Sequence, residues 1–333
     1  MTRLAEPLVE IHRGPILESL HTGHAVVADH TGQIVDSWGD PEAVILPRSS
    51  AKMIQALPLV ASGAARAAGL TPQHLALACA SHQGALAHVD PVRAWLADLG
   101  LNDDALLCGP QTTRDRDLRH AMIRADEPTC RVHNNCSGKH TGFLTLAKHL
   151  AAGPDYVDPA HPVQRAVFEA FETVTDRPIV GYGVDGCSAP NPATPLAALA
   201  RAMAWFASAQ DRSDTLSTAA AQLTQAMIAH PDMVAGDGRA CTRLMRAARG
   251  AAALKTGAEG VFVAILPQKR LGVALKISDG ATRAAESAVA AILVKLGVLE
   301  AGDPETQAFM VPAIRNWDGL ETGRIQPAAT LRL

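Results

Sequence analysis

Ser49 and Lys52 stand three residues apart, just after Pro47 and at the expected start of a helix. One helical turn would place both side chains on the same face. A neutral lysine amine within reach of a serine hydroxyl can take its proton, provided that burial or a nearby cation lowers the lysine pKa. With 13 serines and seven lysines in 333 residues, this spacing arises by chance about 0.3 times, so the pattern needs a second motif.

Lys255, Thr256 and Gly257 supply that motif at the end of a predicted strand. A Lys-Thr-Gly triplet follows Ser-x-x-Lys in this order in serine acyl-transferases. Only seven of the 30 basic residues are lysines, and arginine cannot act as a base, so lysines in such positions are informative. The two motifs predict one pocket that contains serine hydroxyls and lysine amines.

Ser81 lies between these motifs, where the same group of enzymes carries a Ser-x-Asn element. Gln83 occupies the third position here. The Ser81 hydroxyl could relay protons to Lys255, or it could simply cap a helix. From the residues alone both interpretations stay open.

Two segments gather thiols with other polar side chains. Cys136, Lys139 and His140 precede a helix expected from Thr141, and Cys187 stands near Asp185 in a turn rich in glycine and proline. A helix N-terminus favours a thiolate. Because neither segment has zinc-finger spacing, the residues alone allow a metal site or buried core thiols. The other four cysteines are expected to be core thiols: Cys79, Cys108, Cys130 and Cys241.

The elements that must position these residues follow from periodicity and turn residues. Strands are predicted at both ends of the sequence, over 24–29, 33–38, 43–46, 251–256, 260–266 and 271–277. Helices are predicted over 49–63, where Pro58 should shorten the helix, and near 88–99, 115–125, 141–152, 160–174, 194–209, 214–229 and 281–296.

This pattern predicts an α/β (α+β) fold in which a mostly antiparallel sheet with flanking helices lies beside a helical lobe. Residues of about 1–70 and 235–333 would form the sheet lobe, and about 71–234 the helical lobe, of a single catalytic domain over 1–333.

Composition excludes several classes of protein. The chain is 48% hydrophobic with a formal net charge of -3, which suits a folded protein, and only 4% aromatic, so no nucleic-acid partner is expected. Apolar runs such as 260–266 are far shorter than the roughly 20 residues that cross a bilayer, so no membrane segment is expected. The N-terminus lacks the pattern of a signal peptide, from which we expect a cytoplasmic location and reduced cysteines.

Taken together, these motifs resemble the L-asparaginase II family, the thermolabile rhizobial-type L-asparaginases. The resemblance implies a serine β-lactamase-like fold related to glutaminases, the hydrolysis of L-asparagine to aspartate and ammonia, and a homodimer. It runs over nearly the whole chain and rests on the segments 47–52, 80–82, 134–140, 183–187 and 255–260.

The resemblance also implies roles for individual residues. Ser49 with Lys52 would form one catalytic Ser-Lys pair, and Ser81 with Lys255 a second. Cys136, Lys139 and Cys187 resemble the ligands of a Zn²⁺ ion, which we expect to support substrate binding rather than the chemical step. The residues expected to bind the substrate are Arg48, Asn135, His140, Asp185, Thr256 and Glu259.

Two alternatives remain at this point. One is another acyl-serine enzyme on the same scaffold, either a glutaminase or a hydrolase of β-lactams or peptides. The other is a catalytically silent sensor in which zinc or the thiols are the functional centre.

Overall fold

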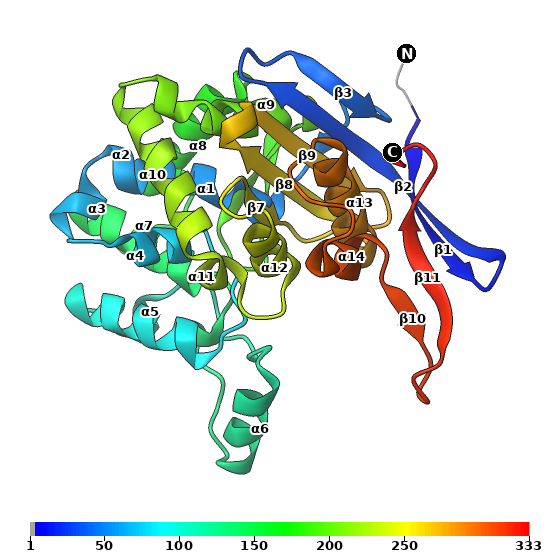
Figure 1. Cartoon of the computed structure of the whole chain (residues 1–333). Coiled ribbons are helices and arrows are strands. Elements are labelled where there is room, and N and C mark those ends of the chain that lie inside the picture. The colour runs from blue at the N-terminus through cyan, green and yellow to red at the C-terminus, as the bar shows by residue number, and fades with distance from the viewer. Residues whose placement is uncertain (1–3, 333) are drawn as a thin grey trace. The chain divides into compact units, whose positions relative to one another are not determined.

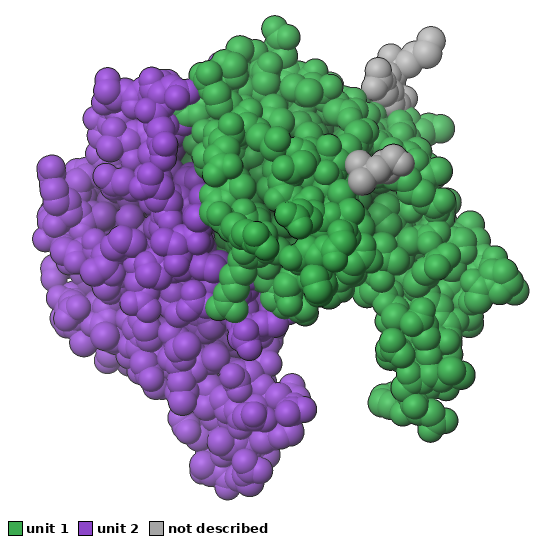
Figure 2. Space-filling model, in the orientation of Figure 1, with its two compact units in different colours: residues 1–50, 194–208, 243–333 green, residues 51–193, 209–242 purple. Residues whose placement is uncertain are grey.

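The computed structural model describes residues 4–332 (Figure 1), and the chain divides into two compact units (Figure 2). Unit 1 comprises Met1–Ser50, Thr194–Ser208 and Arg243–Leu333, and unit 2 comprises Ala51–Ala193 and Ala209–Thr242. The first division therefore falls between Ser50 and Ala51, inside the Ser-x-x-Lys motif, whereas the sequence analysis places it near residue 70.

Unit 1 contains an eight-stranded sheet in which every neighbouring pair is antiparallel. The predicted fold class, α/β with a mostly antiparallel sheet and flanking helices, is confirmed. The strand order is β10 (Ala313–Arg315), β11 (Glu321–Pro327), β1 (Glu6–Arg13), β2 (Ile16–Asp29), β9 (Leu271–Ile277), β8 (Val261–Leu266) and β7 (Ala253–Thr256), and β3 (Ile34–Trp38) also pairs with β2.

The central strands of this sheet are covered on both faces by helices. All six residues of β8 are 0% exposed, which explains why its sequence is continuously apolar rather than alternating. The helices α9 (Leu196–Ala207) and α13 (Thr282–Lys295) both pack on β8 and β9. A Cβ on Gly272 of β9 would lie 2.3 Å from the carbonyl oxygen of Ala200, so only glycine allows α9 to approach the sheet this closely.

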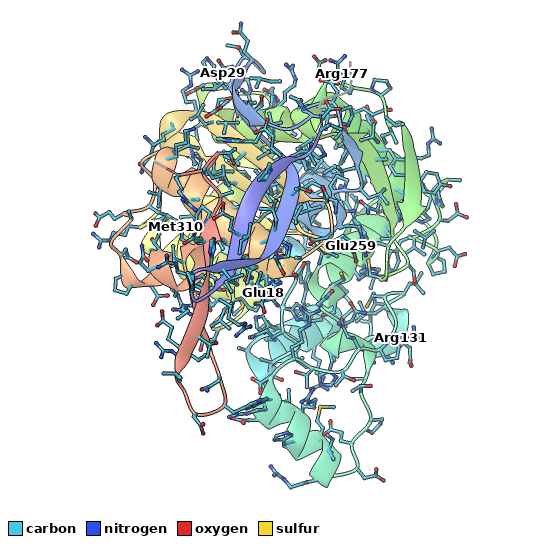
Figure 3. The ribbon with its side chains drawn as sticks, turned by 90° about the vertical axis from the view of Figure 1, so that its right-hand side faces the viewer. Glu18, Asp29, Arg131, Arg177, Glu259 and Met310 are labelled. Atoms are coloured by element: carbon cyan, nitrogen blue, oxygen red, sulfur yellow. The ribbon has the colours of Figure 1, made fainter. Side chains whose placement is uncertain are left out.

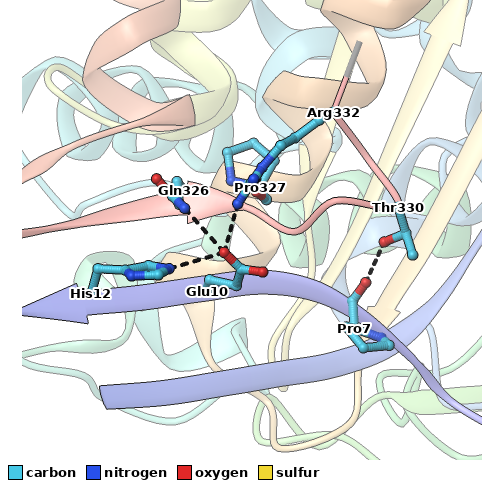
Figure 4. Close-up of polar contacts among 7 residues, drawn as sticks. All are labelled: Pro7, Glu10, His12, Gln326, Pro327, Thr330 and Arg332. Atoms are coloured by element: carbon cyan, nitrogen blue, oxygen red, sulfur yellow. Dashed lines mark hydrogen bonds and ion pairs between the residues drawn. The ribbon is translucent and has the colours of Figure 1, made fainter. Parts of the chain in front are cut away.

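The two ends of the chain are joined through β1 and β11, which the sequence analysis did not predict. The Glu10 carboxylate on β1 accepts hydrogen bonds from His12 (3.0 Å), Gln326 (3.0 Å) and Arg332 (2.6 Å), as Figure 4 shows. These bonds, the one from His12 first, lower the pKa of Glu10. The C-terminal strand thus completes the sheet beside the N-terminal one.

Unit 2 is mainly helical, as predicted for the middle of the chain. Its helix α7 (Ser137–His149) is buried over eleven consecutive residues, from Ser137 to Ala147. A Cβ on Gly138 would lie 2.4 Å from the carbonyl oxygen of Leu77 on α4 (Pro72–Ala78), so this glycine lets the two helices touch. The other helices of the unit are α1 (Lys52–Gln55), α2 (Leu57–Ala61), α3 (Ala64–Ala67), α5 (Leu86–Asp98), α6 (Arg116–Arg124), α8 (Pro162–Thr175), α10 (Thr215–Ala229) and α11 (Pro231–Ala235).

Two predicted elements differ from the structure in ways that affect the site. The single helix expected over 49–63 is divided into the 3-10 helix η1 (Arg48–Ala51), α1 and α2, with Pro58 in the first turn of α2. The helix expected from Thr141 begins four residues earlier, at Ser137, so Lys139 and His140 stand in its first turn.

Short elements complete the two units. A three-stranded sheet has the order β4 (Val44–Ile45), β6 (Pro190–Pro195), β5 (Gly181–Val184), and the turn between β5 and β6 contains Cys187. The remaining elements are α12 (Ala240–Ala247), α14 (Pro304–Met310), η2 (Asp103–Ala105), η3 (Arg131–His133), η4 (Ala209–Asp211) and η5 (Pro267–Lys269). Within residues 4–332, no helix has the length and apolar character that a membrane crossing demands.

Candidate active site

The turn that carries Ser49 lies in unit 1. Ser49 is half-buried on η1, whereas the neighbouring Ser50 is fully buried and donates its hydroxyl to the carbonyl oxygen of Pro47 at 2.8 Å. Arg48, before them, has a φ of +55°, in the left-handed region that costs a non-glycine residue energy. Of the two serines, Ser49 is the one whose hydroxyl is not used to hold the turn.

Gly257, the last residue of the Lys-Thr-Gly triplet, packs directly against this turn. A Cβ on Gly257 would lie 2.6 Å from the carbonyl oxygen of Pro47 and 3.3 Å from the backbone nitrogen of Ser50. Only glycine permits this approach. The two stretches, about 200 residues apart in the sequence, therefore lie side by side within unit 1, as the two motifs predict.

Lys255 is fully buried on β7, and its Nζ donates to the carbonyl oxygen of Thr256 at 2.7 Å. Thr256 is half-buried. Glu259 (Figure 3) is exposed in the turn between β7 and β8, with a φ of +60°, and its carbonyl oxygen accepts a hydrogen bond from Lys276. The candidate residues of unit 1 thus provide a half-buried hydroxyl, a buried amine and an exposed carboxylate.

Lys52 is the first candidate residue of unit 2 and stands at the first position of α1. Its side chain is 1% exposed. Nζ donates a hydrogen bond to the carbonyl oxygen of Ala80 and another, at 3.5 Å, to that of Asn135. Lys52 is therefore held beside Ser81, the residue after Ala80.

Ser81 follows α4 and is 7% exposed, and its backbone N–H donates to the carbonyl oxygen of Val234 at 2.8 Å. Gln83, which stands where the β-lactamase pattern has Asn, donates its amide to the carbonyl oxygen of Asp237 at 3.0 Å. The Gln83 amide thus holds the loop at Gly236 and Asp237. Each predicted Ser-Lys pair has one member in each unit, so both pairings stay predictions.

The predicted zinc ligands come together within unit 2. Cys136 caps the N-terminus of α7, Lys139 lies one turn later, and Nζ of Lys139 donates to Sγ of Cys187 at 3.1 Å. All three side chains are at most 4% exposed. A hydrogen bond from Cys136 and the charge of Lys139 hold the pKa of Cys187 well below its usual value, whereas the pKa of Cys136 is raised.

His140 lies beside these thiols. The Tyr156 hydroxyl accepts the backbone N–H of Leu107 at 2.7 Å and also forms a hydrogen bond with Nδ1 of His140 at 2.9 Å. Burial has the largest effect on the pKa of His140, and a hydrogen bond with Cys187 has a smaller, opposite effect. Burial lowers the pKa of His140 to about 4, which keeps the ring neutral at physiological pH.

Of the predicted ligands, the two cysteine sulfurs are donors that Zn²⁺ commonly takes, whereas the lysine nitrogen is an unusual one. Among residues 4–332, no group of three or more His, Cys, Asp or Glu side chains could hold a metal ion. The predicted ligand set contains only two residues of these types, Cys136 and Cys187, and its third member is Lys139. A zinc site at Cys136, Lys139 and Cys187 therefore stays a prediction.

The remaining predicted residues flank this cluster. Oδ1 of Asn135 lies 2.9 Å from Sγ of Cys136, and the backbone N–H of Asn135 donates to the side chain of Gln111 at 2.9 Å. Asp185 is half-buried in the turn before Cys187 and accepts the backbone N–H of Gly186 at 2.7 Å. Ser188, after Cys187, has a φ of +70°.

The family model for L-asparaginase II matches residues 9–327, essentially the whole chain. The chain belongs to the L-asparaginase II family. Membership of this family indicates an amidohydrolase, an enzyme that hydrolyses a carbon–nitrogen amide bond.

Comparison with solved structures finds distantly similar chains, among them two of Mglu and one of a β-lactamase. No curated protein sequence matches this chain. The solved structure of Mglu in its tris and glutamate form is 12% identical to this chain. The match covers 90% of this chain and 65% of the Mglu chain, with a TM-score of 0.49. Mglu in its native form gives 13% identity, 86% and 66% coverage, and a TM-score of 0.47, so this chain spans less than two thirds of the length of either Mglu chain.

A β-lactamase from Mycobacterium bovis is 14% identical to this L-asparaginase II family chain. The match covers 82% of this chain and 94% of the β-lactamase chain, with a TM-score of 0.42.

Sequence reasoning missed two residues that the structure places at the centre of unit 2. His82 and Tyr156 are fully buried, and both hold neighbours of predicted site residues through side-chain hydrogen bonds. The position of His82 directly after Ser81 is a signal that could have identified it. Tyr156 stands in a loop and gives no such signal.

Proposed function

We propose that this member of the L-asparaginase II family hydrolyses L-asparagine to L-aspartate and ammonia, with Ser49 as the nucleophile. The observation that carries the proposal is the close packing of Gly257 on the turn at Pro47 and Ser50. It supports a site in which the half-buried Ser49 hydroxyl and the Lys-Thr-Gly strand act together. Family membership supplies the reaction class.

In the first step Lys52 removes the proton from Oγ of Ser49, and Oγ attacks the carbon of the side-chain amide. Backbone N–H groups around Ser49 stabilise the oxyanion that forms. The carbon–nitrogen bond then breaks, the nitrogen takes up the proton and ammonia leaves, which gives an ester between Ser49 and the aspartyl group. Ser81 and Lys255 form a second pair that carries protons to the leaving nitrogen. A water molecule hydrolyses the ester and releases aspartate.

Substrate recognition requires partners for the charged α-carboxylate and α-ammonium groups. We assign the carboxylate to Arg48 and the ammonium group to Asp185 and Glu259, because opposite charges form the strongest hydrogen bonds. Thr256, Asn135 and His140 would add neutral contacts. His140 is suited to this role because its lowered pKa keeps the ring uncharged at physiological pH.

Cys136, Lys139 and Cys187 would hold a zinc ion. When bound there, zinc supplies a fixed positive charge that orients the substrate. The two thiols and the Lys139 amine must lose their protons to act as ligands, so zinc occupancy should fall as the pH is lowered. We further propose a homodimer, which light scattering on the purified protein would test.

Ammonia release tests the proposal. We expect release from L-asparagine to be faster than from L-glutamine, and Ser49→Ala to lower kcat by at least about 10³-fold. Ser50→Ala is the matched control, because it removes the adjacent hydroxyl; the loss of its hydrogen bond to Pro47 should lower stability and reduce kcat far less than Ser49→Ala does.

Other results would point elsewhere. Faster release from glutamine would indicate a glutaminase, and hydrolysis of nitrocefin without ammonia release a β-lactam hydrolase. Full activity in Ser49→Ala would overturn the nucleophile assignment. Stoichiometric zinc in a protein without activity on any of these substrates would support a zinc or thiol sensor.

A further inference from the structure

His82 joins the segment after α4 to the beginning of α7. The side chain is 0% exposed. Its Nδ1 accepts the backbone N–H of Gly84 at 3.0 Å, and its Nε2 lies 2.9 Å from Oγ of Ser137, the first residue of α7. The ring also stacks on His88, with 4.9 Å between the ring centroids. No step of the proposed mechanism uses this residue.

The hydrogen bonds define one tautomer of His82. Since Nδ1 accepts from Gly84, the ring proton resides on Nε2, which donates to Ser137. The Ser137 hydroxyl in turn donates to the carbonyl oxygen of Val132 at 2.9 Å. Burial lowers the pKa of His82 well below 6.5, so this tautomer persists at neutral pH. The link between the two segments is therefore permanent under ordinary conditions.

This link fixes the relative position of two backbone carbonyl groups. Ala80 lies two residues before His82, and Asn135 lies two residues before Ser137. The backbone N–H of His82 also donates to the carbonyl oxygen of Asn135 at 3.2 Å. These two carbonyl oxygens are the ones that accept hydrogen bonds from Nζ of Lys52.

The number of acceptors around Lys52 matters for its chemistry. A neutral amine has two N–H bonds and one lone pair. When both N–H bonds point at fixed carbonyl oxygens, the tetrahedral geometry at nitrogen leaves a single direction for the lone pair. A base whose lone pair has one fixed direction loses no orientation entropy in the proton transfer.

We propose that His82 is a positioning residue that orients the amine of Lys52 by holding the carbonyl groups of Ala80 and Asn135 in place. This proposal rests on the proposed function in so far as Lys52 is the base. The orientation itself can be tested without any assumption about the substrate.

The test compares four variants of the full-length protein. His82→Phe removes both ring hydrogen bonds and keeps the stacking on His88. His82→Gln can restore the donor to Ser137, whereas His82→Asn can restore only the acceptor for Gly84. Trp95→Phe is the matched control, because it removes another buried ring N–H that donates to a hydroxyl of α7, that of Thr145 at 3.1 Å.

We expect kcat for asparagine to fall about 10- to 100-fold in His82→Phe and His82→Asn, with KM within about threefold. His82→Gln should recover most of kcat, and Trp95→Phe should keep it within about threefold despite a lower melting temperature. Equal losses of kcat in Trp95→Phe and His82→Phe would overturn the proposal, and so would full activity in His82→Asn.

A second readout does not depend on activity. The rate at which acetic anhydride acetylates Lys52, measured by peptide mass spectrometry, should rise several-fold in His82→Phe and His82→Asn and return toward the original value in His82→Gln. An unchanged rate in all variants would overturn the proposal. A protein that releases no ammonia from asparagine would refute the proposed function, while the labelling rates would still decide the role of His82.

Discussion

Substitution of Gly257 by alanine tests the packing on which the active-site assignment depends. The new Cβ would lie 2.6 Å from the carbonyl oxygen of Pro47. Carbon and carbonyl oxygen rarely approach closer than about 3.3 Å, so the turn or the strand must move by about 0.7 Å. Val261 blocks retreat on another side, since its Cβ would be 3.1 Å away. Because Gly257 does not have a positive φ, the effect would be steric rather than conformational.

A displacement of this size at the nucleophile has a predictable cost. A misplacement of about 1 Å can lower a rate about 10²-fold, so we expect kcat for asparagine to fall about 10- to 100-fold in Gly257→Ala. The free energy of unfolding should fall by about 1–3 kcal/mol, as in other overpacked sites. Steady-state ammonia release and urea unfolding would measure the two effects.

The matched control is Gly302→Ala in the same unit, because a Cβ on Gly302 has no atom within 4 Å. It should leave kcat unchanged and alter the free energy of unfolding by less than about 0.5 kcal/mol. An alanine at position 257 that preserved kcat would refute the reasoning, because the turn carrying Ser49 would then tolerate displacement or lie outside the site.

Three further predictions concern pH, zinc and backbone strain. In the unfolded chain His82 has a pKa of about 6.5, whereas in the folded protein burial keeps the ring unprotonated below that pH. The free energy of unfolding should therefore fall by about 1.4 kcal/mol per pH unit below pH 6.5 because of this residue. Urea unfolding at several pH values should show a weaker dependence of this free energy on pH for His82→Gln. Cys187→Ser should lose the stoichiometric zinc, as measured by elemental analysis, and should raise KM for asparagine more than it lowers kcat. The control variant Cys241→Ala should show neither effect. A loss of kcat at unchanged KM in Cys187→Ser would contradict a binding role for zinc. Arg48 and Arg270 share a φ of +55°, so Arg48→Gly and Arg270→Gly should change the free energy of unfolding by amounts that agree within about 1 kcal/mol. Only Arg48→Gly should raise KM for asparagine, by at least about tenfold. An equal KM for both variants would show that Arg48 does not bind the substrate.

Local sequence signals predicted the centre of the sheet well because its strands and turns carry strong patterns. The hairpin of β2 and β3 alternates around a turn with Gly32, and β8 is a continuous apolar run. The edge strands carry weaker signals. β11 contains Gly323 and mostly half-exposed polar residues, and it forms a strand because β1, about 300 residues away, pairs with it. Such long-range pairing is invisible to a local pattern.

The beginning of α7 illustrates how packing overrides local propensity. Gly138 is a poor helix former, yet it lies inside the helix, whose start the sequence analysis places only at Thr141. In the structure, the same glycine admits the carbonyl group of Leu77, and the helix therefore extends to Ser137. This extension is what places Lys139 within 3.1 Å of Cys187.

Motif spacing identified the residues of the candidate site but not the role of each residue. The Ser-x-x-Lys spacing selects Ser49 rather than Ser50, but only the structure shows that the Ser50 hydroxyl donates a hydrogen bond to the carbonyl oxygen of Pro47. The same holds for His82, whose importance depends on a contact with Ser137, 55 residues further along the chain. Pairwise contacts of this kind require the folded backbone.

Backbone strain at Arg48 and Glu259 fits a functional role but does not by itself indicate one, because Arg249 and Arg270 also adopt positive φ. Arg48 and Glu259 both adopt positive φ, which costs a non-glycine residue about 1–2 kcal/mol. A turn selected for stability alone would carry glycine there, as Gly260 does with a φ of +69° next to Glu259. Each of these turns instead keeps a long charged side chain in the strained position. This conformational cost is explained if the guanidinium group of Arg48 and the carboxylate of Glu259 bind the oppositely charged groups of an amino-acid substrate.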